Sequence, residues 1–282
     1  RYAAFFMECW LNLYIYVNRK LHNPKKRSQM KFFEKRQEEE NFDSFPPIGG
    51  LMVSKMVTDQ NIKPRFMYRE KRTRPEDSGW RIFKGFETDD YINDPNNTGI
   101  YNPSSILKVD PSLQSILLKG IGAVYERTDD DSEWYRVTDF ELEDDYPVMH
   151  KLTNEWTLTI NNLFERSIED NGDLFYTTGD KSVRLAIWNE KGKSKEEIYH
   201  THKQLIANRD QNFDQTLETF EFSDNRVLRT GYLVSEKDDE KEYGVVYGFS
   251  IIDNQVIQLA LYFDEPEDID WALETWKMIE PE

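Results

Sequence analysis

The strongest constraint on the fold is a series of strand-like segments in the last third of the chain. Residues 243–252 and 256–263 are rich in β-branched and aromatic side chains, and a short turn containing Asp253 and Asn254 separates them. Residues 218–222 and 227–234 precede them and have the same character. Four such segments joined by short connections predict a meander of antiparallel strands.

Further strands are predicted just before this meander. Trp156, Leu158 and Ile160 alternate with threonines, which is the period-two pattern of a half-buried strand. Residues 174–177 and 183–188 give two more short apolar segments. This part of the chain therefore reads as sheet-rich from residue 146 onward.

Two helices are predicted around these strands. Ser194 and Glu197 have the spacing of a capping box, and the helix that follows carries Ile198, Leu205 and Ile206. Asp264 and Glu267 flank Pro266 at the start of the last helix. The residues that we expect this helix to turn toward the sheet are Ile269, Leu273, Trp276 and Ile279.

A separate set of short elements is predicted upstream. Residues 51–54, 64–69 and 80–83 read as strands, and 121–127 with 134–138 read as a hairpin whose tip is acidic. Residues 89–104 are rich in Asp, Asn, Pro, Ser and Gly and predict an irregular loop. Asp110-Pro111-Ser112 predicts the start of a short apolar helix that buries Leu113, Ile116 and Leu117.

Strand-rich stretches flanked by helices indicate the α+β class. We expect two domains, each a mainly antiparallel sheet with flanking helices, because the acidic stretch 139–147 interrupts the pattern. The predicted division is an N-terminal helix and charged linker at 1–47, one domain at 48–145 and a sandwich domain at 146–282.

The first 29 residues are net basic, unlike the rest of the chain. Their apolar residues recur at helix spacing, but the stretch is too short and too polar to span a membrane, and no cleavage site follows it. Met30 resembles a natural start, which suggests that residues 1–29 are either an upstream extension or a segment foreign to the native protein. The apolar positions in question are Phe6, Trp10, Leu13, Val17 and Leu21.

The formal net charge of −17 argues against nucleic acid as a partner, because phosphate would repel this chain, and it suggests a basic protein partner. The single cysteine, Cys9, fits a reducing compartment such as the cytoplasm. Histidines are few, and His200 with His202 would point apart on a helix, where we expect both at the surface. We therefore predict no metal and no cofactor.

Asp77-Ser78-Gly79 is the one place where a hydrolase reading could start. The nucleophile elbow requires Gly-x-Ser-x-Gly, yet Glu76 and Trp80 occupy the glycine positions here. A turn whose Asp and Ser bond to backbone amides is the simpler interpretation.

Residues 48–140 resemble a bacterial immunity-protein family found beside polymorphic toxins. Residues 146–280 resemble, less strongly, the PsbP-like α/β sandwich, through strand order and the closing helix. The first resemblance rests on Gly49-Gly50, Val53-Ser54-Lys55, Phe66-Met67-Tyr68-Arg69-Glu70, Pro75-Glu76-Asp77-Ser78-Gly79-Trp80-Arg81-Ile82-Phe83, Gly85, Tyr91, Pro95-Asn96-Asn97, Gly99-Ile100-Tyr101 and Asp110-Pro111-Ser112.

This resemblance implies a non-catalytic immunity protein that binds and occludes a cognate toxin with a basic face. The predicted contact residues are Trp80, Glu87, Asp89, Asp90, Asp129, Asp130 and Asp131. The motif residues expected to shape the fold are Gly50, Asp77, Ser78, Gly79, Trp80, Asp110 and Pro111. A small-ligand or regulatory binding module and a hydrolase that uses Ser78 stay open as alternatives.

Overall fold

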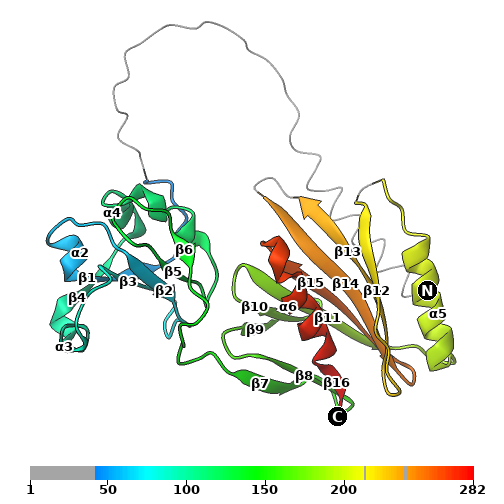
Figure 1. Cartoon of the computed structure of the whole chain (residues 1–282). Coiled ribbons are helices and arrows are strands. Elements are labelled where there is room, and N and C mark those ends of the chain that lie inside the picture. Colours follow the sequence, from blue (N-terminus) through cyan, green and yellow to red (C-terminus); the bar gives the residue numbers. More distant parts are fainter. Residues whose placement is uncertain (1–41, 213, 238–240) are drawn as a thin grey trace, which may run out of the picture. The chain divides into compact units, whose positions relative to one another are not determined.

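A computed structural model describes residues 42–212, 214–237 and 241–282. The predicted N-terminal helix and the question of residues 1–29 lie outside the described residues. Figure 1 shows the described part as sheets with short helices beside them.

The first sheet has the strand order β4-β1-β3-β2-β5-β6. In this sheet β1 and β3 run parallel, and the other neighbours are antiparallel. Short helices connect the strands. The strands are Gly50–Ser54 (β1), Phe66–Arg69 (β2), Asp77–Phe83 (β3), Thr98–Tyr101 (β4), Val124–Glu126 (β5) and Tyr135–Arg136 (β6). The helices are Lys55–Thr58 (α2), Asp89–Ile92 (α3), Pro95–Asn97 (η1), Pro103–Leu107 (α4), Pro111–Leu113 (η2) and Ile116–Leu118 (η3).

One hydrophobic cluster covers one face of this sheet. It joins Leu51, Met67, Trp80 and Ile82 from the strands to Leu107 and other residues of the helical segment that follows β4. The single helix predicted from Asp110 is instead a pair of short 3₁₀ helices, η2 and η3.

The second sheet has the order β12-β13-β14-β15-β11-β10-β9, and all of its pairs are antiparallel. The predicted meander is therefore confirmed, as is the predominance of antiparallel sheet. The strands are Glu165–Ile168 (β9), Leu174–Thr177 (β10), Lys181–Asn189 (β11), Thr216–Glu221 (β12), Leu228–Lys237 (β13), Glu242–Ile252 (β14) and Gln255–Phe263 (β15). A third sheet, ordered β16-β8-β7, consists of Pro147–Lys151 (β7), Trp156–Asn161 (β8) and Ile279–Pro281 (β16).

Two helices lie on opposite faces of the seven-stranded sheet. Lys195–Ala207 (α5) begins with the predicted capping box and packs its Ile198 on Ile251 and Val256. Ile269–Lys277 (α6) follows Pro266–Asp268 (η4) and packs on β14 and β15. Ile279 lies in β16 and not in the helix as predicted, because the helix ends at Lys277.

The core between α6 and the sheets is separate from the core of the first sheet. It contains Trp156, Leu158, Tyr176 and Trp276, all fully buried. Division of the described residues into two domains at 145/146 stays a prediction.

Trp276 fits over the sheet because β13 and β14 carry glycines beneath it. A Cβ at Gly248 would lie 2.5 Å from the indole, which is closer than real contacts allow. The indole Nε1 donates to the Ser250 hydroxyl at 2.9 Å. We expect Gly248→Ala to lower the free energy of unfolding by about 1–3 kcal/mol in urea denaturation. Gly172→Ala, where an added Cβ meets nothing but φ is positive, is the control for backbone strain alone; equal losses in both would contradict the packing argument.

Candidate partner-binding surface

The motif that carries the family resemblance forms the central strand of the first sheet. Ser78 is 1% exposed, and its hydroxyl donates to the Gly50 carbonyl at 2.7 Å and accepts from the Trp80 amide at 3.1 Å. These bonds join the start of β1 to β3. The side chain therefore serves the fold, and nothing in its surroundings exposes it to a substrate.

Gly79 is required by close backbone approach. Its φ is +82°, and a Cβ there would lie 2.2 Å from the Glu70 carbonyl oxygen. Beside it, Asp77 accepts two hydrogen bonds from Arg81, at 3.0 and 2.7 Å, and Arg81 also donates to Glu70 at 2.7 Å. The hydrogen bonds from Arg81 hold the pKa of Asp77 below its usual value.

Trp80 is fully buried, and its indole Nε1 donates to the Leu117 carbonyl at 3.0 Å. The prediction that Trp80 contacts a partner is therefore wrong, because β1 and β2 flank its strand and the helical segment covers its ring. The alternative role, shaping the fold, fits this position. Trp80 links the central strand to η3.

Asp110 and Pro111 also serve the fold. Asp110 accepts from the Ser112 amide and hydroxyl, and it pairs with Arg127, both partners being almost fully buried. Arg127 donates twice to the Pro64 carbonyl and lies 4.5 Å from the centre of the Trp134 ring. Pro111 takes the first position of η2, where its missing N–H costs nothing.

The topology brings the two predicted acidic segments to the same end of the first sheet. Phe83 at the end of β3 pairs with Phe66, which also pairs with Glu126 at the end of β5. The segment 84–97, which contains Asp89 and Asp90, and the segment 127–134, which contains Asp129 to Asp131, therefore leave the sheet at one end. Asp89, Asp90, Asp129 and Asp131 are exposed there.

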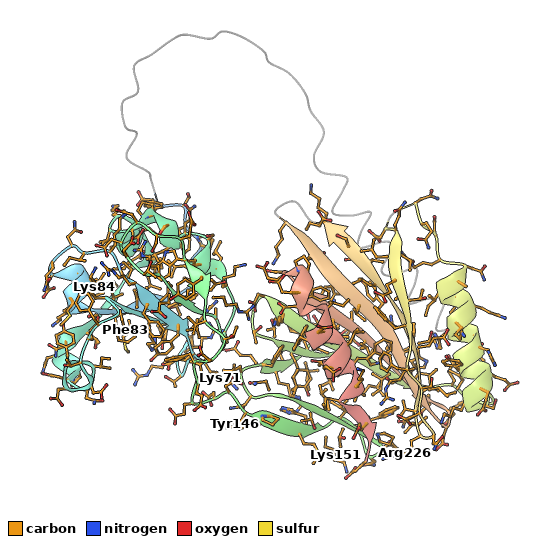
Figure 2. The ribbon with its side chains drawn as sticks, in the orientation of Figure 1. Lys71, Phe83, Lys84, Tyr146, Lys151 and Arg226 are labelled. Atoms are coloured by element: carbon orange, nitrogen blue, oxygen red, sulfur yellow. The ribbon has the colours of Figure 1, made fainter. Side chains whose placement is uncertain are left out.

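Two of the predicted contact residues, Asp130 and Glu87, are instead engaged in local hydrogen bonds at this end of the sheet. Asp130 accepts from Lys84 at 2.8 Å and from Arg65 at 2.7 Å, and these hydrogen bonds lower its pKa to about 2. Glu87 accepts from the amides of Lys84, Gly85 and Phe86. Lys84, which follows Phe83 at the end of β3 (Figure 2), thus ties Glu87 to Asp130.

The edge strand β4 is a feature that the sequence analysis missed. It lies at the end of the sheet order and carries Ile100, which at 78% is the most exposed large apolar side chain of the described residues. A groove of about 660 Å³ adjoins its end. The groove is lined by residues 42, 43, 45–50 and 100–104, among them Phe45, Pro46, Pro47 and Tyr101.

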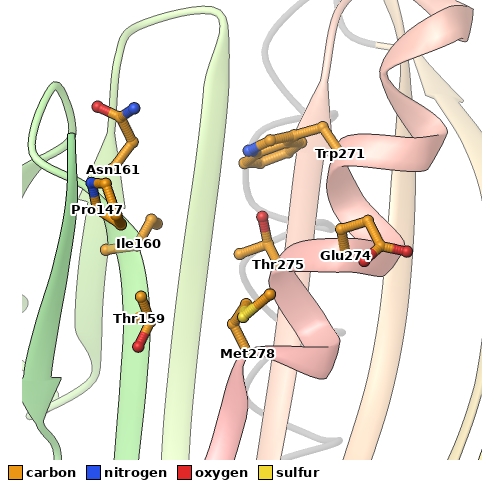
Figure 3. A pocket seen from close by; sticks show the side chains of 8 residues that line it. All are labelled: Pro147, Thr159, Ile160, Asn161, Trp271, Glu274, Thr275 and Met278. Atoms are coloured by element: carbon orange, nitrogen blue, oxygen red, sulfur yellow. The ribbon is translucent and has the colours of Figure 1, made fainter. Parts of the chain in front are cut away.

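A second, smaller cavity lies between α6 and the third sheet. Figure 3 shows Trp271 and Thr275 of α6, with Met278 just after it, facing Ile160 and Thr159 of β8 across the cavity. Its volume is about 230 Å³, and its walls are mainly apolar. Sites for ordinary small-molecule ligands occupy roughly 300–1,000 Å³, so this cavity is small for such a role.

His202 is buried, contrary to the prediction that it lies at the surface. Its ring stacks on Phe249 with centroids 4.1 Å apart, and Trp188 lies edge-on to it. Burial lowers its pKa to about 4. His200, by contrast, is exposed.

No described group of three His, Cys, Asp or Glu side chains could hold a metal ion. Within the same ranges, none of the helices has the length and apolar character needed to cross a membrane.

Solved structures that are similar to part of this chain include the cyanobacterial PsbP (CyanoP) of Synechocystis sp. PCC 6803. It is 6% identical over 52% of this chain and 97% of its own, with a TM-score of 0.36. A Bacteroides thetaiotaomicron VPI-5482 protein is 7% identical over 45% of each chain, with a TM-score of 0.34. The Saccharomyces cerevisiae Ran-binding protein Mog1p is 11% identical over 46% of this chain and 83% of its own, with a TM-score of 0.30.

No curated protein is significantly similar to the chain in sequence. Family comparison does give a match in the first sheet, over residues 51–138, to the Immunity protein Imm33 domain. The matched residues include β2 to β6 and nearly all of β1. The immunity-family resemblance predicted for residues 48–140 is therefore confirmed, and residues 51–138 are those that match the Imm33 domain.

Proposed function

We propose that this chain is a non-catalytic immunity protein that binds a cognate bacterial toxin and neutralises it by occlusion. The match of residues 51–138 to the Immunity protein Imm33 domain carries this proposal. Because the inhibitor is not consumed or turned over, one molecule would neutralise one toxin molecule. We place this encounter in the cytoplasm, as the single cysteine suggests.

The charge of the molecule supports a toxin with a basic face. The net charge is −17, and Asp89, Asp90, Asp129 and Asp131 are exposed at one end of the first sheet. Such a surface raises the association rate with a basic partner more than it raises the final affinity. A toxin that acts on nucleic acid would present a basic face, since its cleft must attract phosphate.

The two alternatives have less support in the structure. Ser78 is buried, and its hydroxyl is bonded to backbone groups, so it is poorly placed to act as a hydrolase nucleophile. The cavity beside Trp271 is below the usual volume of a small-ligand site. Neither feature favours a second function over neutralisation of a toxin.

Neutralisation is tested by producing the full chain together with the toxin encoded by the gene next to its own. We expect growth to be restored and a one-to-one complex to elute from a sizing column. Continued toxicity at equal or excess amounts of the chain, with no complex, would reject the proposal for that toxin.

Reversing the exposed charges should slow binding. We expect Asp89→Lys, Asp90→Lys and Asp129→Lys together to lower the association rate by about tenfold at low salt and to flatten its salt dependence. Asp89, Asp90 and Asp129 are chosen because their side chains are exposed. Glu87 and Asp130 are left unchanged because they make hydrogen bonds that stabilise the fold. The control makes the same change of net charge elsewhere, at the exposed Asp170, Glu196 and Glu218. An equal fall in association rate in both triple variants would show that only net charge matters. An unchanged association rate in both would reject electrostatic steering of the toxin.

A further inference from the structure

One long side of β4 has no strand beside it within the described residues. The strand pairs with β1 through Ser54↔Thr98 to Leu51↔Tyr101, and the sheet ends there. The outer side of an edge strand presents backbone N–H and C=O groups that an added strand can pair with. Edge strands are commonly protected by proline or lysine, and the sequence Thr-Gly-Ile-Tyr has neither.

The two ends of β4 differ in chemistry. At the Tyr101 end lies the groove of about 660 Å³, whose walls include Phe45, Pro46 and Pro47. At the Thr98 end, α3 and η1 lead into the strand and carry Asp89, Asp90 and Asp94, all exposed. The four residues of β4 span roughly 13 Å at about 3.3 Å per residue, so one short segment could reach both ends.

Other edge strands lack this combination. Strand β7 exposes Met149 at 70% but begins with Pro147, and β6 is two residues long and carries Arg136. On β12, the Glu221 carboxylate is already engaged, since it accepts from Tyr199 and Lys203 of α5. Among the edge strands of the described residues, β9 and β16 included, only β4 lies both beside the larger groove and within the residues that match the Imm33 domain.

We propose that β4 receives an extended segment of the toxin as an added strand. The segment carries apolar side chains at the end that enters the groove, and lysine or arginine at the end that meets Asp89, Asp90 and Asp94. Backbone pairing supplies affinity, while the groove and the acidic residues select the sequence. This inference rests on the proposed function and specifies where and how the toxin binds.

The test compares two exposed apolar residues on two edge strands. Ile100→Lys places a charge on the β4 edge, while Met149→Lys makes the same kind of change on β7, outside residues 51–138. Both side chains are more than two-thirds exposed, so both variants should keep the wild-type melting temperature. With the purified toxin encoded by the neighbouring gene, we expect Ile100→Lys to weaken Kd by about tenfold or more and Met149→Lys by less than about twofold.

Amide hydrogen exchange on the wild-type full chain gives a second measurement that needs no variant. Strand addition should slow exchange at residues 98–101 in the complex, with no such change at residues 147–151. An unchanged Kd for Ile100→Lys, or complex formation without new protection at residues 98–101, would overturn the β4 site while neutralisation stands. A wild-type chain that neither binds nor protects against the toxin would overturn both proposals.

Discussion

Replacing Asp110 with alanine is expected to lower the free energy of unfolding by about 3–5 kcal/mol, the largest loss we predict for a single substitution. Asp110 is 1% exposed, and it pairs with Arg127, which is 3% exposed. Without the carboxylate, the guanidinium keeps only the Pro64 carbonyl and the face of Trp134. The substitution leaves a buried cation without a counter-charge, which destabilises the folded state. Equilibrium unfolding in urea measures the loss in free energy of unfolding.

The second substitution of a double-mutant cycle separates this charge effect from lost packing. Asp110→Ala with Arg127→Met removes both charges, so the double variant should be more stable than Asp110→Ala alone. Lys151→Ala breaks an ion pair with Glu282 in which both side chains are about half exposed, and it should cost less than about 1 kcal/mol. Lys151 lies far along the chain, on β7 (Figure 2). A loss at Asp110 as small as that at Lys151 would show that the buried pair contributes little.

The long strands were predictable because their patterns depend on local sequence. The expected segments 243–252 and 256–263 correspond to β14, Glu242–Ile252, and β15, Gln255–Phe263. The turn at Asp253, whose φ is +44°, also suits a residue type that tolerates this conformation. In such a hairpin, one strand is the immediate neighbour of the next, so little information from elsewhere in the chain is needed.

The candidate surface was less predictable, because it depends on pairing between distant segments. Strand β4 has four residues, includes Gly99 and follows an Asn- and Pro-rich segment, so it read as loop. It becomes a strand by pairing with β1, some 45 residues away. The sequence did not show that Trp80 is fully buried, because its burial requires β1 and β2 on either side and η3 above.

For the acidic residues too, the sequence gives the composition but not the contacts that each side chain makes. Asp129, Asp130 and Asp131 are alike in sequence, yet Arg65 and Lys84 engage only the middle one so closely that its pKa falls to about 2. Both cations come from segments more than 45 residues away. The motif string that carries the family resemblance likewise consists largely of residues that build the sheet, as Ser78, Gly79 and Asp110 illustrate.

His202 was missed although the sequence held a signal for it. Ile198, His202 and Ile206 are spaced four apart and are all buried on one face of α5. The prediction placed Leu205 on that face, but Leu205 is 51% exposed. Reading the histidine as a polar surface residue shifted the expected inner face of the helix.

Acidification is expected to destabilise the protein through His202. Burial against Phe249 and Trp188 lowers the pKa to about 4, and of the nearby charges Glu190 raises it while Lys193 lowers it. The Nδ1 atom has no hydrogen-bond partner among the described residues. Because the unfolded chain binds the proton near pH 6.5 and the folded chain only near 4, stability is full above pH 6.5 and falls as pH drops toward 4.

At pH 5 this difference amounts to about 2 kcal/mol, and it approaches about 3 kcal/mol below pH 4. Urea unfolding at pH 7.5 and pH 5 measures it. His202→Phe keeps an aromatic ring on Phe249 but cannot take up a proton, so it should lose most of this pH dependence. His200→Phe changes the exposed histidine two residues away and should retain the pH dependence. His150→Phe removes the contribution of His150, whose pKa burial also lowers. If wild type and His202→Phe lose equal stability between these two pH values, the folded chain does not keep a proton off the His202 ring. The His202 side chain would then be open to water in the folded state.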